Sequence, residues 1–452
     1  MRRDRSRWIL VVALCGGYFL VLLDVTVVNV ALPQIGSVLH ARSTGLAWVV
    51  DAYSVPLAAL LLASGAIGDR LGHRRVVLAG FAGFGIASVL CALAPTIAVL
   101  IAARAVQGTG AALMLPGTLA LLVECAPSER SGARLVGVWA AIGGAALPAG
   151  PVIGGLLVQC AGWRAVFWLS VPVIALALLP VVRLPRPRAE ASHDTAVDWT
   201  GAALMATGLA CVVTAIIQGQ RSPALGGLLA FAAVCIAVAF WRVERSTGHP
   251  LLPVPRDVRR PLAAACLVAG LMNLCALGCL FLLTQFFQDV RGLSPLLAGL
   301  ATLPAMLPLP LLGAPAGRLS ARVGVWRTSA LGLLASAIGF AGIAVGIAGA
   351  NYVVLLCSLA LWGAGLGVLT PAIVSAALQA APGTPGVASG ASNTSRQTGG
   401  ALGVAIFGAA AGASGSSSFV SHATVLFTAA AVAFALTAGL CLAAARSTRG
   451  SA

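Results

Sequence analysis

Lysine is absent from this sequence of 452 residues, and charge of either sign is scarce. Only 9% of the residues are charged, whereas soluble proteins average about 25%. Hydrophobic residues make up 59% of the chain, and the mean hydropathy is +0.99. This composition is typical of a membrane protein and excludes an ordinary soluble one. The absence of lysine also excludes a Walker A phosphate loop, because that loop requires a lysine.

Clusters of metal ligands are lacking as well. The 11 cysteines lie almost all within apolar runs, and they show neither paired zinc spacing nor the pattern of a secreted disulfide framework. The five histidines fall in expected loops or at the ends of apolar stretches. We therefore expect no metal site and no cofactor. Because no layer of the chain gathers histidines, lysines or carboxylates, we do not expect an enzyme.

Long apolar runs dominate the chain instead. A helix that crosses about 30 Å of hydrocarbon needs about 20 apolar residues, so the length allows roughly twelve to fourteen spans. Apolar stretches bounded by charged or turn residues predict an all-α integral membrane protein with fourteen transmembrane helices. The expected spans are 8–32, 46–66, 76–94, 97–122, 135–160, 164–182, 199–219, 223–241, 262–286, 295–315, 325–349, 351–378, 397–415 and 422–445.

The 28 arginines are distributed unevenly over the expected loops. With the amino terminus placed inside, 23 arginines lie in inner loops or at the termini, four lie outside, and Arg104 lies within a span. One span too many or too few would exchange the two sides for every later loop, so the asymmetry supports an even number of spans. It places both termini in the cytoplasm and explains the net charge of +16 by topology. Nucleic acid is not an expected partner, because the arginines scatter among apolar segments.

Two inexact internal repeats relate the halves of the chain. GAIGDRLGHR at 65–74 is echoed by GAPAGRLSAR at 313–322, and Gly108 and Gly110 are echoed by Gly363 and Gly365. Repeated halves with a solute site between them are typical of secondary transporters. We predict an N-terminal six-helix bundle over 1–182, a linker with two extra spans over 183–261, and a C-terminal six-helix bundle over 262–452.

Acidic residues within spans are costly and are therefore candidates for function. Of the 12 acids, only Asp24 and Asp51 fall well inside expected spans. Counted at 1.5 Å per residue from the outer ends, Asp24 and Arg104 both lie about 12 to 14 Å deep. An adjacent arginine would keep the carboxylate ionised, whereas an apolar wall would favour its protonation. The pair predicts proton coupling; a permanent structural ion pair, or an arginine bonded only to backbone carbonyls, is the alternative.

Four further polar residues near the outer ends of the first two spans are candidates for substrate or cation binding. Asp51 is expected about 7 Å from the outer end of its span, on one face with Trp48. That face could receive a cationic solute, and an exposed carboxylate at the rim fits the same pattern. Thr26 and Asn29 share a face of the first span that is turned away from Asp24.

Glycine and proline interrupt two expected spans. The fifth span can form either a moving interface or a tight static contact, because it contains Gly143, Gly144, Pro148, Gly150, Pro151, Gly154 and Gly155. The tenth span is a candidate wall of the solute path, because irregular backbone at membrane depth is tolerated where it is buried or lines a cavity. Its prolines are Pro304, Pro308, Pro310 and Pro315.

Segments along nearly the whole chain match transporter motifs in the expected order. They include LDVTVVNVALP at 23–33, WVVDAYS at 48–54, GAIGDRLGHRR at 65–75, RAVQGTGAA at 104–112 and LPAGPVIGG at 147–155. With these motifs the sequence resembles the major facilitator superfamily and, within it, the fourteen-span drug:proton antiporters. The resemblance implies a major facilitator fold of two six-helix bundles plus two extra helices.

The resemblance also implies roles for the residues at matching positions. Asp24 would be the proton-linked or substrate-linked carboxylate, with Arg104 as its partner. In the second copy of the inner loop Gly317 replaces Asp69, so only the first half is expected to gate there. The inner gating loop would comprise Gly65, Asp69, Arg70, Gly72, Arg74 and Arg75, and the antiporter hinge would comprise Pro148, Gly150, Pro151, Gly154 and Gly155.

Together these features predict a multi-pass protein of the bacterial cytoplasmic membrane that exports hydrophobic drugs or antibiotics in exchange for protons. The proton gradient would supply the drive, so no cofactor is expected, and the protein would act as a monomer. The tenth span carries no acid, which favours neutral or monocationic substrates over the doubly charged ones that the resemblance associates with such an acid. A proton-coupled metabolite importer and a membrane sensor that moves nothing are the alternatives, because fold alone does not separate them.

Overall fold

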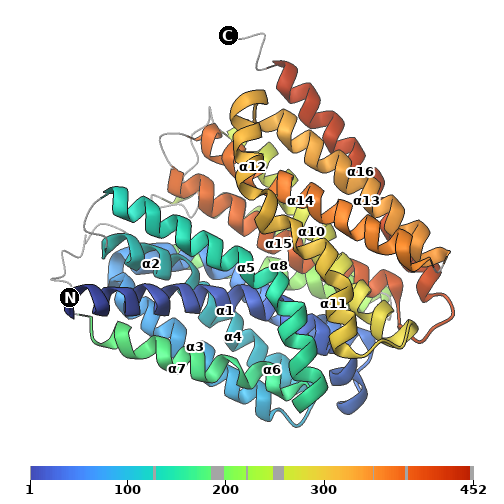
Figure 1. The fold of residues 1–452 in the computed structure, drawn as a ribbon, viewed down its shortest axis with the longest axis horizontal. Coiled ribbons are helices and arrows are strands. Elements are labelled where there is room, and N and C mark those ends of the chain that lie inside the picture. The colour runs from blue at the N-terminus through green and yellow to red at the C-terminus, as the bar shows by residue number, and fades with distance from the viewer. Residues whose placement is uncertain are drawn as a thin grey trace. The chain divides into compact units, whose positions relative to one another are not determined.

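The computed structural model describes residues 2–125, 129–184, 198–219, 222–247, 259–349, 351–381 and 385–447. Within this part every regular element is a helix, as Figure 1 shows. Helices suit a bilayer because each bonds its own backbone groups and leaves none exposed to hydrocarbon. The chain divides into two units, Met1–Pro253 and Val254–Ala452.

The first unit contains nine helices among its described residues. Helix α1 packs mainly against α5 and α7, α2 against α4, and α3 against α4 and α7, while α9 packs on α8, which in turn lies against α2. Their bounds are α1 Arg2–Val38, α2 Ser43–Leu71, α3 His73–Leu93, α4 Ile97–Glu124, α5 Glu129–Ala161, α6 Arg164–Trp168, α7 Ser170–Val182, α8 Trp199–Gly219 and α9 Pro223–Ser246.

The second unit is built around α13, which packs against α14 and α16, and around the pair formed by α10 and α15. Its elements are α10 Arg259–Gln285, the π-helix η1 Phe286–Val290, α11 Pro295–Met306, α12 Pro308–Val323, α13 Val325–Ala348, α14 Tyr352–Ala380, α15 Pro385–Ala411 and α16 Phe419–Ser447.

Two of the expected spans are each made of two helices. The span at 164–182 consists of α6 and α7, which meet at Leu169. The proline-rich span expected at 295–315 consists of α11 and α12, which meet at Leu307, and it continues to Val323. A break at Leu307 is expected because a proline has no backbone N–H to donate and its ring crowds the preceding turn. Pro33 does not end α1, which continues to Val38.

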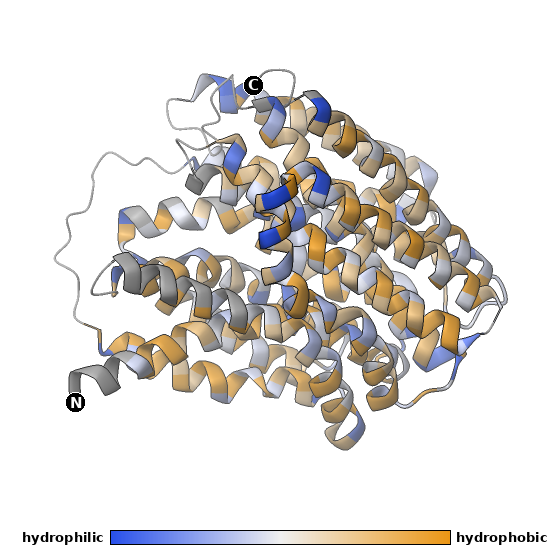
Figure 2. Cartoon of the chain, turned by 45° about the horizontal axis from the view of Figure 1, so that its top comes forward, coloured by the Kyte–Doolittle hydropathy of each residue, from blue (hydrophilic) through white to orange (hydrophobic). Residues whose placement is uncertain are grey.

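Thirteen segments of the described residues are long and apolar enough to cross a membrane. Figure 2 shows the apolar residues covering most of the length of the helices. With α15 the helical segments reach the predicted fourteen, but α15 differs from the span expected at 397–415. It begins at Pro385 and ends at Ala411, and its first half is rich in serine and threonine. The apolar run alone set the expected boundaries, so the polar first half was missed.

Polar residues in α15 are accommodated by close packing on α10. Ser395 Oγ donates a hydrogen bond of 2.6 Å to the carbonyl oxygen of Cys266, and a Cβ on Gly399 would collide with the backbone of Gly270. Arg396, which the sequence placed in an inner loop, lies within this helix. A polar helix can therefore occupy a span position because another helix, rather than lipid, covers much of it.

The two units share an internal repeat whose register differs from the one expected. Gly72 joins α2 to α3 with φ of +88°, and Gly324 joins α12 to α13 with φ of +93°. This conformation suits glycine because other residues have a Cβ that clashes there. Gly324 is thus the counterpart of Gly72. The predicted pairing of 65–74 with 313–322 therefore shifts toward the carboxyl end of the second copy by about one helical turn. Ala321, not Gly317, stands at the position of Asp69.

The predicted glycine repeat is confirmed by the packing of α4 and α14. A Cβ on Gly108 would collide with the backbone of Tyr53 in α2, and a Cβ on Gly363 would collide with the backbone of Ala305 in α11. Gly110 lies equally close to Phe84 of α3, as Gly365 does to Ser336 of α13. Each half therefore builds the same three-helix contact around equivalent glycines.

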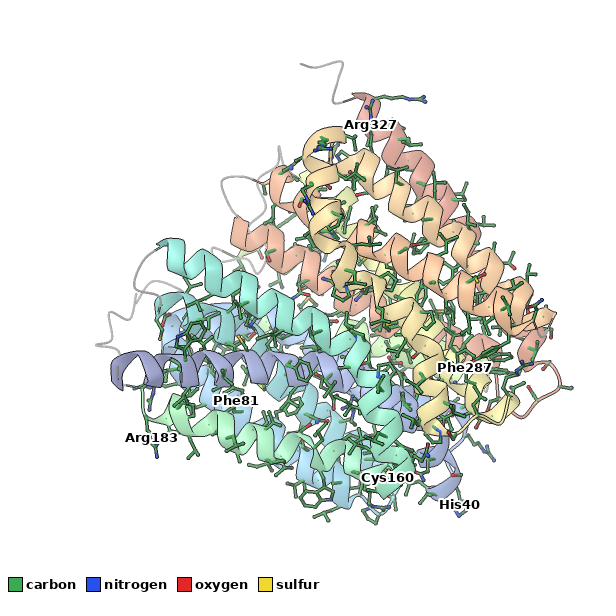
Figure 3. The ribbon with its side chains drawn as sticks, in the orientation of Figure 1. His40, Phe81, Cys160, Arg183, Phe287 and Arg327 are labelled. Atoms are coloured by element: carbon green, nitrogen blue, oxygen red, sulfur yellow. The ribbon has the colours of Figure 1, made fainter. Side chains whose placement is uncertain are left out.

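Helix ends in the first unit separate as the arginine pattern predicts. In Figure 3, Arg183 at the end of α7 lies at one end of this unit, and His40 and Cys160 lie at the opposite end. Helices α8 and α9, expected as extra spans in a linker over 183–261, belong to the first unit. Residues 185–197 and 248–258 lie outside the described part, so the predicted domain boundaries stay a prediction.

Candidate functional site

Asp24 and Arg104 form a buried ion pair between α1 and α4. Nη1 of Arg104 donates a hydrogen bond to Oδ2 of Asp24. Arg104 is 1% exposed and Asp24 is 4% exposed. Nε of Arg104 donates to the carbonyl oxygen of Val49 in α2 at 3.0 Å. The predicted shared depth of Asp24 and Arg104 is confirmed. The alternative in which Arg104 bonds only to backbone carbonyl groups is wrong.

Gln107 completes this pair and was not among the residues predicted from the sequence. Its Oε1 accepts a hydrogen bond of 2.7 Å from Nη1 of Arg104, and its Nε2 donates to Oδ1 of Asp24 at 3.3 Å. The same Nε2 donates to Oγ of Ser88 in α3 at 2.9 Å. Three helices are thereby joined to one carboxylate. The position of Gln107 one turn after Arg104 was the available signal.

Aromatic rings close the site around the guanidinium. Cζ of Arg104 lies 4.3 Å from the ring centre of Tyr53 and 5.9 Å from that of Phe167. Tyr53 Oη donates to the carbonyl oxygen of Val21 at 3.2 Å, which fixes the ring against α1. A buried guanidinium over aromatic faces gains cation–π attraction and loses access to water. The arginine therefore has neighbours that can hold its charge even when the carboxylate is neutral.

Asp51 lies in α2 and is fully buried, with 0% exposure. Neither of its carboxylate oxygens has a hydrogen-bond partner among the described residues. The expectation of an exposed rim carboxylate is therefore wrong, because the surrounding helices cover this turn of α2. Trp48, one turn earlier, is half-buried. A buried carboxylate without a partner is costly, so Asp51 stays a candidate functional residue.

Thr26 and Asn29 lie in the helix packing of α1. Thr26 Oγ1 donates to the carbonyl oxygen of Leu23 at 3.1 Å, and a Cβ on Gly150 of α5 would collide with that hydroxyl. Asn29 Nδ2 donates to the carbonyl oxygen of Val25 at 2.8 Å, and both residues are buried. Asp24 bonds to α4 and Thr26 contacts α5, which confirms that they lie on different faces of α1.

The glycine-rich helix α5 approaches α1 closely along its length. A Cβ on Gly143 would collide with the ring of Tyr18, which stacks on Trp139 with ring centres 3.6 Å apart. A Cβ on Gly154 would lie 3.1 Å from the carbonyl oxygen of Val27. The helix runs without interruption through Pro148 and Pro151 to Ala161, and Gly155 is buried within it. This arrangement is the close α1–α5 contact that the glycines predicted.

The inner loop between α2 and α3 is fastened to α7 by one arginine. Nε of Arg74 donates to the carbonyl oxygen of Val181 at 3.1 Å, and Nη2 donates to that of Val182 at 2.6 Å. A cation at a helix carboxyl end is favoured by the free carbonyl groups there. Arg70 and Arg75 are exposed, Gly65 has open space around it, and the side chain of Asp69 lies outside the described part.

Comparison with known proteins decides the family. Residues 14–404 match the sequence profile of the Major Facilitator Superfamily. The chain belongs to this superfamily. It is 35% identical to the methylenomycin A resistance protein of Streptomyces coelicolor, over 90% of this chain and 86% of that protein. It is 34% identical to the drug efflux pump JefA of Mycobacterium tuberculosis, over 87% and 78% of the two chains.

A third relative is the tetracenomycin C resistance and export protein of Streptomyces glaucescens, 34% identical over 89% of this chain and 75% of that protein. Among solved structures, a peptide transporter in complex with sulfate superposes with a TM-score of 0.70 at 16% identity, over 96% of this chain and 94% of that one. At that identity the likeness shows the fold alone. The predicted major facilitator fold is confirmed.

The second half of this major facilitator chain lacks a counterpart of the charged site. At the positions that the glycine repeat equates with Ser88 and Gln107 stand Phe340 and Trp362, whose ring centres lie 5.4 Å apart. Leu359, fully buried, stands where Arg104 would be. An aromatic contact thus replaces the polar one, and the ion pair is confined to the first unit. The described residues contain no group of metal ligands.

Proposed function

We propose that this multi-pass membrane protein exports hydrophobic antibiotics or drugs from the bacterial cytoplasm in exchange for protons. The relatives support export, since they carry names of resistance and efflux proteins. The observation that carries proton coupling is the sealed ion pair of Asp24 and Arg104, because a carboxylate inside a span is rarely retained without a role. Both termini are assigned to the cytoplasm on the arginine asymmetry.

Protonation of Asp24 is the proposed coupling step. A proton on the carboxylate removes its attraction for Arg104, while the guanidinium keeps the carbonyl of Val49 and the amide of Gln107 as acceptors. The aromatic faces of Tyr53 and Phe167 remain beside it. The contact between α1 and α4 is thereby weakened without leaving an unpaired arginine. Each proton that moves inward releases about 2.3 kcal/mol of free energy per 100 mV of membrane potential, and the pH difference adds to this.

Asp51 is proposed as a second site on the same unit. Its unpaired carboxylate can take a proton or the cationic group of a substrate, with Trp48 nearby on the same face. The described part of the second unit holds one acid, Asp289, which lies in η1 directly after α10 and is exposed. This scarcity favours neutral or monocationic substrates, because the described part of the second unit offers a dication no buried carboxylate. The protein is proposed to act as a monomer without a cofactor.

Everted vesicles with an acidic interior test the proposal. A panel of antibiotics and cationic dyes is added while the pH gradient is followed with a fluorescent probe. We expect wild type to release the gradient with at least one hydrophobic compound, and Asp24→Asn to abolish that release. The variant Asp24→Asn with Arg104→Gln keeps the net charge and controls for the buried unpaired arginine. If no compound moves protons in wild type, antiport is contradicted.

Direction separates the export proposal from its alternatives. An exporter accumulates compound inside everted vesicles, an importer accumulates it in right-side-out vesicles, and a sensor does neither. The matched measurement uses one labelled compound from the panel in both preparations. Accumulation only in right-side-out vesicles would replace export by import.

A further inference from the structure

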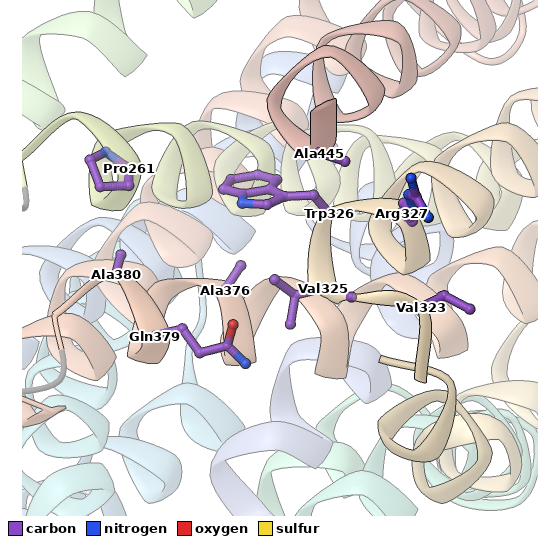
Figure 4. A pocket seen from close by; sticks show the side chains of 10 residues that line it. Pro261, Val323, Val325, Trp326, Arg327, Ala376, Gln379, Ala380 and Ala445 are labelled. Carbon is purple, nitrogen blue, oxygen red and sulfur yellow. The ribbon is translucent and has the colours of Figure 1, made fainter. Parts of the chain in front are cut away.

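The second unit contains a cavity of about 400 Å³ among the ends of five helices. Figure 4 shows Trp326 and Arg327, at the start of α13, together with Gln379 in the last turn of α14. Pro261 in the first turn of α10, Val323 at the end of α12 and Ala445 in the last turn of α16 also line it. The arginine asymmetry assigns all five of these helix ends to the cytoplasmic side.

The first unit fills the equivalent place with its own side chain. There Arg74, the second residue of α3, reaches the carbonyl oxygens of Val181 and Val182 at the end of α7. By the shared glycines Gly72 and Gly324, the counterpart of Arg74 is Trp326. Trp326 has no guanidinium that could donate hydrogen bonds to the carbonyl groups at the carboxyl end of a helix. Trp326 therefore does not make the contact that Arg74 makes, and a cavity lies beside it.

The charge around this cavity is one-sided. Arg327 lines it, and Arg260, Arg322 and Arg446 are the exposed sequence neighbours of lining residues. The carboxyl ends of α12, α14 and α16 outnumber the two helix amino ends, of α10 and α13, so the positive sign comes from the arginines. From Val254 onward the sequence has two acids: Asp257, which lies outside the described part, and Asp289 in η1, whose Oδ2 accepts a hydrogen bond from Oγ of Ser414. Among the described residues that line the cavity there is no acid.

Polar groups suited to a phosphate converge on the same space. The first turn of α13 has no side chain of the described residues capping its backbone N–H groups. Backbone N–H groups at a helix amino end and a neighbouring guanidinium are a common combination for phosphate. Trp326 adds an amphipathic ring of the kind that lies at the level of lipid headgroups. Val325 and Ala376 supply an apolar wall for the glycerol part of a lipid.

We propose that this cavity binds the phosphate headgroup of an anionic phospholipid of the inner leaflet, with phosphatidylglycerol as its chemical type. The phosphate bonds to Arg327 and to the first turn of α13, and the acyl chains leave toward the bilayer. Basic pockets between helices on the cytoplasmic side are known to take such headgroups. The occupant supplies the negative charge that the second unit does not provide there.

Lipid binding to the purified full-length protein tests this site without any transport measurement. Retained lipid is counted by native mass spectrometry after incubation with phosphatidylglycerol, phosphatidylethanolamine or phosphatidylcholine. We expect phosphatidylglycerol to bind more tightly than the other two, and Arg327→Gln to weaken its binding by about tenfold, equivalent to about 1.4 kcal/mol. Arg245→Gln is the matched control, because Arg245 lies at the cytoplasmic end of α9 and stacks on Trp241.

A second variant keeps all the charges and fills the space. Ala380→Phe places a ring beside the cavity, and it is expected to reduce phosphatidylglycerol binding while Arg245→Gln does not. Excess inorganic phosphate at constant ionic strength is expected to displace little lipid. Equal binding of the three lipids, or unchanged binding in both cavity variants, would overturn the proposal. Full displacement by inorganic phosphate would assign the cavity to a free anion instead.

Discussion

At the residue scale, one hydrogen-bond network around a carboxylate joins groups from three helices. Asp24 contributes the charge, Arg104 the counter-charge, and Gln107 the link to Ser88. Such networks are strongly coupled, because each buried donor or acceptor left without a partner costs about 1–3 kcal/mol. Replacement of a single member therefore changes both the stability of the site and the protonation of Asp24.

Gln107→Leu is expected to uncouple transport while the protein still inserts. The leucine fills a similar volume but removes the hydrogen bonds to Arg104, Asp24 and Ser88, with a cost of roughly 2–3 kcal/mol. Thermal unfolding in detergent measures the loss, and gradient release in vesicles measures the coupling. Ser88→Ala, which removes one of these bonds, is the matched control with a smaller effect. Normal proton coupling in Gln107→Leu would show that Gln107 contributes only packing.

At the scale of elements, the glycines of α5 and the arginine of the α2–α3 loop hold helices at fixed separations. Thr26 and Val27 lie against Gly150 and Gly154, so α1 and α5 approach more closely than side chains would permit. Arg74 ties the inner end of α3 to the end of α7. Movement of these helices during transport therefore requires either sliding at glycine or release of the arginine.

Gly150→Val is expected to destabilise the first unit by about 1–3 kcal/mol or more, because its side chain would meet Thr26. Gly144→Ala is the control from the same helix, since nothing lies within 4 Å of the added Cβ. That variant should change stability by less than about 0.5 kcal/mol. Thermal unfolding of both variants in the same detergent checks the difference. Equal stability would contradict the close contact of α1 and α5.

Arg74→Gln is expected to lower stability by about 0.3–2 kcal/mol, because it loses the two bonds to the end of α7. Arg75→Gln removes the same charge from the next, exposed position and is the control. Thermal unfolding compares them, and vesicle transport shows whether the contact also limits the rate. An effect no larger in Arg74→Gln than in Arg75→Gln would assign it to net charge alone.

At the scale of the whole molecule, the two halves have similar helix packing but different side chains at matching buried positions. Equivalent glycines organise both, yet the first half carries an ion pair where the second carries Leu359 and the contact of Phe340 with Trp362. The proposed protonation therefore acts on the first half, since the second has no ion pair at the matching positions. The arginine asymmetry predicts one orientation for both halves across the membrane.

That orientation predicts the labelling of single cysteines in an otherwise cysteine-free protein. Cys160, exposed near the expected outer end of α5, should react with a membrane-impermeant maleimide in intact cells. A cysteine introduced by Ser246→Cys at the end of α9 should react only in everted vesicles. The reverse pattern would invert the topology and with it the direction of transport.

The sequence by itself determined the class of fold and the principal charges of the site. Apolar runs fix the spans because hydrocarbon admits only internally bonded helices, and a rare acid at the depth of Arg104 marks the pair. Tertiary structure alone decided the role of Gln107, the burial of Asp51, the polar helix α15 and the register of the repeat. These depend on which helix faces which side chain, and periodicity along one helix does not contain that information.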